Sequence, residues 1–166
     1  MGLLLLGACS PTFNWRDLRP NGTPLQALMP CKPELVERTV PLAGAPTRMH
    51  MHNCEAGGRT FVVAWADVTG EARVPEILAG WRAGSLAAIR VDPATASDVN
   101  TEWPVQVKGA QHLLGLQATG QDPQGKTTQI RGAYFAKGTQ VFQAAVYGPT
   151  LPDEALTPFF EGLRLP

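Results

Sequence analysis

Two strand-like stretches near the C-terminus, Thr127 to Ala136 and Thr139 to Tyr147, are joined by the dipeptide Lys137-Gly138. A connection this short can join antiparallel strands only, because a parallel crossover needs a dozen or more residues. The pair therefore predicts a sheet that is antiparallel at this point, and no other feature restricts the fold class as strongly.

Other stretches have the same strand texture. Thr60–Val68 is apolar on both faces, which is typical of a strand inside a covered sheet. It follows a Gly-Gly hairpin turn within Glu55–Arg59. We expect further strands at Leu25–Cys31, Val36–Leu42, Thr47–Cys54 and Val105–Thr119, the last with bulges or bends at Gly109 and Gly115.

Two segments have helical character. Val74–Ile89 begins with a proline at a first helical position and carries apolar residues at helical spacing, among them Trp81, which we expect in the core. After a polar linker at Asp92–Trp103, the chain should close with a helix over Leu151–Leu165 that is interrupted near Pro158. The prediction is a single α+β domain, with an antiparallel sheet packed against one long helix and a C-terminal helix.

The charge balance excludes one class of partner. The 166 residues include 14 Lys and Arg and 14 Asp and Glu, so the formal net charge is zero. Nucleic-acid binders concentrate basic residues on one face. We therefore expect no nucleic-acid partner.

Near the N-terminus, Leu3-Leu4-Leu5 is followed by the run Leu6-Gly7-Ala8-Cys9. It resembles the lipobox that closes a bacterial lipoprotein signal peptide, although Met1-Gly2 lacks the basic residues that begin such signals. The resemblance implies that Cys9 is lipidated and that the protein is anchored to a membrane. The alternative is an apolar N-terminus that packs on the domain, with Cys9 as a buried thiol.

Three cysteines fit an oxidising compartment if one of them has a role other than disulfide pairing. With Cys9 lipidated, Cys31 and Cys54 remain to form a disulfide, which an export compartment would allow. The alternative is two reduced, buried thiols in a cytosolic protein. The chain-entropy estimate for closing this loop is about 3 kcal/mol of stabilisation.

Metal binding is the only site chemistry with residue support. On an alternating strand, His50, His52 and Cys54 share one face while Met49 and Met51 share the other. Imidazoles suit zinc or copper, and the third histidine, His112, lies on a strand that could approach. His50 and His52 are the metal candidates, but we predict no metal, because the set of ligands is incomplete.

Catalytic motifs are missing from the sequence. Gly84-Ser85 lacks the second glycine of a nucleophile elbow, and no glycine-rich phosphate loop occurs. We therefore expect a protein that is not an enzyme and has no cofactor.

The expected organisation is a partial signal peptide at 1–8, a lipidated tether at 9–23 and a globular domain at 24–166. In the tether, Phe13 and Trp15 suit either a membrane surface or the edge of the core, and we prefer docking on the domain.

The layout from Leu25 to Leu165 resembles the Mog1/PsbP-like fold, including DcrB-like envelope lipoproteins. The segments that carry the resemblance are Met29-Pro30-Cys31-Lys32-Pro33, Phe61 to Asp67, Gln129 to Phe135, Gln140 to Ala145 and Phe159 to Leu165. It implies a non-enzymatic accessory or assembly factor that binds another protein. The lipobox, with Ser10 after the cysteine, implies an envelope location, in the outer membrane facing the periplasm. The alternative function is a periplasmic zinc or copper protein that uses His50 and His52.

Overall fold

The computed structural model describes residues 12–96 and 98–166, and it is an α+β fold built on a six-stranded antiparallel sheet. The sheet order is β3-β4-β5-β8-β7-β6, with strands β3 (Glu34–Leu42), β4 (Ala45–Ala56), β5 (Arg59–Asp67), β6 (Gln111–Gln121), β7 (Thr127–Lys137) and β8 (Gln140–Gly148). The antiparallel hairpin predicted from Lys137-Gly138 is confirmed as β7–β8. The predicted α+β class is confirmed with it.

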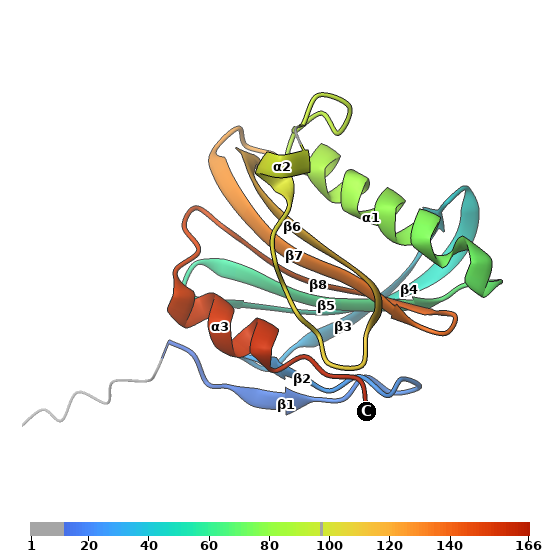
Figure 1. The fold of residues 1–166 in the computed structure, drawn as a ribbon. Coiled ribbons are helices and arrows are strands. Elements are labelled where there is room, and N and C mark those ends of the chain that lie inside the picture. Colours follow the sequence, from blue (N-terminus) through green and yellow to red (C-terminus); the bar gives the residue numbers. More distant parts are fainter. Residues whose placement is uncertain (1–11, 97) are drawn as a thin grey trace, which may run out of the picture.

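Two layers cover the sheet from opposite sides (Figure 1). On one side lies α1 (Val74–Ala88), which connects β5 to β6 after a short 3₁₀ turn at Glu71–Arg73. On the other side lie α3 (Asp153–Glu161) and a ribbon of two short antiparallel strands, β1 (Arg16–Leu18) and β2 (Ala27–Met29). In the segment between α1 and β6, a short helix, α2 (Asp98–Thr101), interrupts the predicted polar linker.

Successive side chains of β5 point to opposite faces of the sheet and pack against the layers on both sides. Phe61, Val63 and Trp65 face the ribbon and α3, whereas Ala64 and Ala66 face α1. Phe61 makes an edge-to-face contact with Phe159 of α3, and its ring also meets Phe13 and Trp15. The expectation that Phe13 and Trp15 dock on the domain is therefore confirmed, and a two-sided core explains why β5 is apolar throughout.

Three predicted elements need correction. Leu25–Cys31 is not a strand of the main sheet, because only Ala27–Met29 is extended and it pairs with β1. The strand predicted from Val105 begins at Gln111, because the preceding residues form a loop that crosses β6 and packs against α3 through Trp103 and Phe160.

The third correction concerns Pro158, where we expected the closing helix to break. The helix is shorter than predicted, Asp153–Glu161, and it runs through Pro158 without interruption. Ala155, Leu156, Phe159 and Phe160 are buried, and this packing holds the helix despite the missing N–H of the proline.

Within the described residues, no helix is long and apolar enough to cross a membrane.

Candidate binding site

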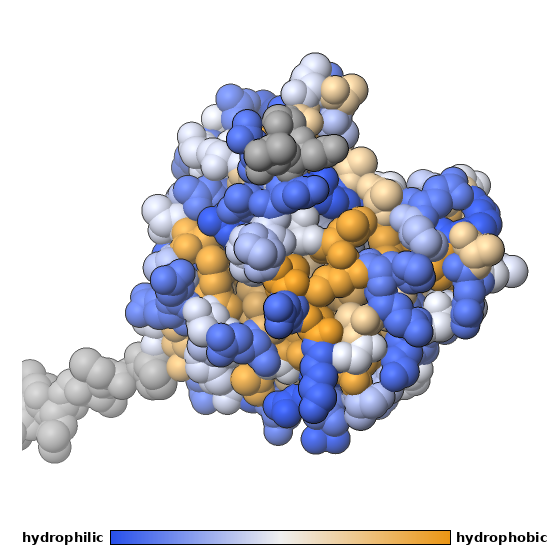
Figure 2. Space-filling view, viewed as in Figure 1, coloured by the Kyte–Doolittle hydropathy of each residue, from blue (hydrophilic) through white to orange (hydrophobic). Residues whose placement is uncertain are grey.

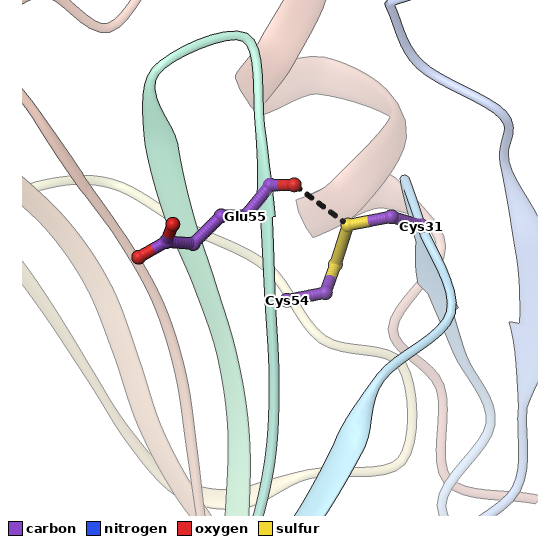
Figure 3. The surroundings of a disulfide bond; sticks show 3 residues. All are labelled: Cys31, Cys54 and Glu55. Atoms are coloured by element: carbon purple, nitrogen blue, oxygen red, sulfur yellow. Dashed lines mark hydrogen bonds between the residues drawn. A yellow bond between two sulfur atoms is a disulfide. The ribbon is translucent and has the colours of Figure 1, made fainter.

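A disulfide joins Cys31 and Cys54, as the cysteine count predicted for an oxidising compartment, with 6.0 Å between the two Cα atoms. Cys31 follows β2 of the ribbon, and Cys54 lies on β4 with its side chain in the core beneath (Figure 3). The Sγ atom of Cys31 lies 3.4 Å from the carbonyl oxygen of Glu55, a contact without a hydrogen bond because a bridged sulfur carries no proton. The bridge therefore ties the ribbon covalently to the sheet. Cys9, the predicted lipid site, lies outside the described residues.

His50 and His52 do share a strand face, as predicted, but each has other contacts. The ring of His50 stacks on Trp65 with a centroid distance of 4.2 Å, and its Nδ1 lies 3.0 Å from Oε1 of Glu37. Arg48 also pairs with Glu37, and this lowers the pKa of the Glu37 carboxyl more than the bond to His50 does. Burial, with a smaller effect from His50, lowers the pKa of His52. These contacts describe a polar cluster on the same face of β3 and β4 as Cys54.

The suggestion that His112 could approach this pair is wrong. His112 is on β6, at the opposite edge of the sheet from β3 and β4. Four interstrand steps separate β4 from β6, or about 19 Å. In the part of the chain that the structure describes, no group of three or more His, Cys, Asp or Glu residues could hold a metal ion.

A groove runs between α1 and the β3–β4 hairpin, with a volume of about 400 Å³. We call it the α1 groove. Its lining comes from β3, β4, β8 and one side of α1: Val40, Pro41, Leu42, Ala43, Met49, Met51, Gly80, Trp81, Gly84, Ser85, Ala88, Gln143 and Tyr147. None of these side chains is charged. Apolar walls around a few convergent polar groups are the usual composition of a ligand pocket.

The floor of the α1 groove is a buried hydrogen-bond network. The hydroxyl of Tyr134 lies 2.6 Å from Oγ of Ser85, and Nε2 of Gln143 donates to both hydroxyl oxygens at 3.2 and 3.3 Å. Ser85 in turn donates to the carbonyl of Trp81 one helical turn earlier. Burial raises the pKa of Tyr134 and also that of Tyr147 beside it. Both tyrosines therefore stay neutral under ordinary conditions.

Two glycines of α1, Gly80 and Gly84, face this groove, and a Cβ atom at either would meet nothing within 4 Å. Glycine inside a helix costs about 1 kcal/mol relative to alanine. Neither position has a positive φ, so neither backbone conformation requires glycine. The pair keeps the helix side of the groove open at a cost in helix stability.

Trp81 was expected in the core, and it only partly belongs there. Its ring meets the ring of Tyr134 edge-on while its exposed part forms a wall of the groove. The groove itself was not predicted. Its walls come from segments far apart in the sequence, and the spacing of Gly80, Gly84 and Ala88 at four-residue intervals was the one signal that could have indicated it.

A second apolar surface lies where the loop before β6 crosses that strand. A cavity of about 540 Å³ there is lined in part by Trp103, Pro104, Leu113 and Leu114. Figure 2 shows hydrophobic residues gathered on this face of the molecule with hydrophilic residues around them. We call this the front surface.

Beside this loop, Arg82 of α1 links β6 to α2, because its guanidinium donates to the carbonyl of Gly115 and to the hydroxyl of Thr101. Next to the front surface, the guanidinium of Arg131 lies 5.9 Å from the ring centre of Trp103. Burial lowers the pKa of Arg131, and the charge of Asp153 opposes that effect. The ring of Trp103 therefore contacts both the guanidinium of Arg131 and the ring of Phe160.

No protein-family model, curated protein or solved structure matches this chain. The chain is thus defined as an α+β domain with one disulfide, an uncharged groove beside α1 and an apolar front surface. Its function has to be argued from these features.

Proposed function

We propose that the chain is an exported bacterial lipoprotein whose domain, of the Mog1/PsbP-like type, is a non-enzymatic accessory or assembly factor that binds another protein of the cell envelope. Cys9 would carry the lipid and anchor the domain in the outer membrane, facing the periplasm. The domain would act by binding, not by catalysis.

The observation that carries the proposal is the disulfide between Cys31 and Cys54. Disulfides persist in oxidising compartments such as the periplasm and are rare in the cytosol. The bridge uses two of the three cysteines, so Cys9 is the one left for lipidation. Export and lipidation together account for every cysteine in the chain.

The front surface supports a binding role. An apolar patch rimmed by polar residues usually marks a site of protein or membrane interaction. Trp103 is an aromatic side chain of the kind that dominates binding energy in interfaces. We make no metal proposal for His50 and His52, because no group of three or more His, Cys, Asp or Glu among residues 12–96 and 98–166 could hold a metal ion.

Lipidation is tested by labelling cells with a radioactive fatty acid. We expect label in the wild type and none in Cys9→Ser. Cys31→Ser and Cys54→Ser serve as controls and should keep the label. Equal incorporation in the wild type and Cys9→Ser would refute the anchor.

Partner binding is tested by placing a photocrosslinking amino acid at Leu113 on the front surface, with a control at the exposed Thr95. Crosslinking in whole envelopes should give one discrete adduct from position 113 and none from position 95. Absence of any adduct from position 113 would remove the front surface from the proposal.

A further inference from the structure

The α1 groove carries an inference that does not depend on whether Cys9 is acylated or whether the front surface binds a protein. We infer that this groove binds an uncharged, largely apolar small molecule that carries one hydrogen-bonding group, such as a hydroxyl or amide group on an aliphatic chain.

The charge of the ligand follows from the lining. All residues that line the groove are uncharged, and Tyr134 below the floor and Tyr147 in the wall hold their protons. A buried charge needs a partner of opposite sign or a dense set of hydrogen bonds, and neither is present in the groove. An anionic or cationic ligand would therefore be rejected.

The polar group on the ligand follows from Gln143. This residue is 7% exposed, and its Nε2 is used by the hydroxyls of Ser85 and Tyr134. Tyr147 also makes a side-chain hydrogen bond with Gln143, and both side chains line the groove. The amide of Gln143 and the hydroxyl of Tyr147 are therefore the polar groups that a hydroxyl or amide of the ligand would meet.

The apolar body of the ligand follows from the walls and from the glycines. Val40, Met51 and Trp81 are partly exposed apolar side chains around the opening. Gly80 and Gly84 leave open space above the helix where side chains would otherwise fill it. The volume of about 400 Å³ falls in the range of small-molecule pockets.

The probe is 1-octanol, compared with octanoate and octylammonium, which have the same chain length and opposite charges. Titrated into the purified full-length chain, 1-octanol should bind saturably at one site and shift the amide resonances of Gly80 and Gly84 in ¹⁵N spectra. Octanoate and octylammonium should perturb these two glycines at least ten times more weakly. Equal effects of all three probes, or no saturation by octanol, would overturn the inference.

Gly84→Leu tests the site, because it fills the groove from a helical position where glycine is not required. It should weaken octanol binding at least tenfold. Ala87→Leu, an exposed position of α1 outside the groove, is the matched control and should bind as the wild type does. Circular dichroism verifies that both variants are folded, and wild-type binding by Gly84→Leu would reject the site.

Gln143→Leu tests the polar contact and should weaken octanol binding about 3- to 10-fold, the effect of one lost hydrogen bond. Unchanged octanol affinity in this variant would overturn the assignment of a hydrogen-bonding group to the ligand. Sedimentation of the ligand-free chain tests whether a second copy of the chain fills the groove instead. If the wild type forms dimers and Gly84→Leu does not, the small-molecule inference is wrong.

Discussion

Among single residues, Gly115 shows how closely the loop before β6 approaches the sheet. A Cβ atom at this position would lie 1.8 Å from the carbonyl oxygen of Trp103. The expected bulge or bend at Gly115 is not found, since Gly115 pairs in register with Ala133 and the register shift lies between Gln111 and Leu114. The glycine is required instead by the close approach of the preceding loop, which local sequence does not show.

Gly115→Ala should therefore lower the free energy of unfolding by about 1–3 kcal/mol, the usual cost of overpacking, because the backbone of the loop must move. Gly80→Ala is the opposite case, since its Cβ meets nothing, and should raise the free energy of unfolding by about 1 kcal/mol. Urea denaturation measures both. A Gly115→Ala variant as stable as the wild type would show that the loop does not rest on β6.

Tyr134 predicts an alkaline limit to stability. Its pKa is raised by burial, whereas in the unfolded chain a tyrosine ionises near pH 10. Above that pH the unfolded state binds fewer protons than the native state, so the free energy of unfolding falls as pH rises. The contribution is present below about pH 10 and is lost progressively above it.

In Tyr134→Phe, the decline in stability between pH 9 and pH 11 should be shallower than in the wild type. At pH 8 the variant should be less stable by about 1 kcal/mol, because the hydrogen bond to Ser85 is lost. Guanidinium denaturation at the two alkaline pH values gives the comparison. Parallel pH profiles would mean that Tyr134 does not set this limit.

At the scale of elements, the prediction succeeded where local patterns decide. The β7–β8 hairpin, the Gly-Gly turn between β4 and β5 with Gly57 and Gly58 at φ 59° and 73°, and α1 all follow from spacing and turn residues. The prediction failed where packing overrides propensity. The ribbon strand β1 has no local signature and exists because β2 pairs with it and Phe61 packs beneath Phe13 and Trp15.

Pro158 is the clearest case in which tertiary packing outweighs a local sequence preference. Its ring removes one backbone donor from α3, and the helix is retained by burial of its apolar side. Pro158→Ala restores a donor that can bond the carbonyl of Glu154, so it should raise the free energy of unfolding by about 1 kcal/mol or more. Thermal denaturation followed by circular dichroism measures the shift. A lower melting temperature would show that the proline is favoured where it stands.

For the whole molecule, sequence alone could not order the sheet. Strand β8 lies between β5 and β7, so the two halves of the sheet are joined through a pairing of residues 60–67 with residues 140–147. Both strands are apolar on both faces, and such a pattern is compatible with many neighbours. The α1 groove could not be predicted for the same reason, because its lining comes from β3, β4, β8 and α1, which are far apart in the sequence.

The disulfide should stabilise one layer of the molecule selectively. It links the end of the ribbon to β4 across 23 sequence positions, and the chain-entropy model gives about 3 kcal/mol for such a loop. Reduction, or the double variant Cys31→Ala with Cys54→Ala, should lower the free energy of unfolding by about this amount. Because the bridge holds the ribbon and not the sheet centre, hydrogen exchange should accelerate first in β1 and β2 while β7 and β8 stay protected. Cys9→Ser is the control and should leave exchange unchanged, and equal acceleration of β8 and the ribbon would show that the bridge supports the fold as a whole.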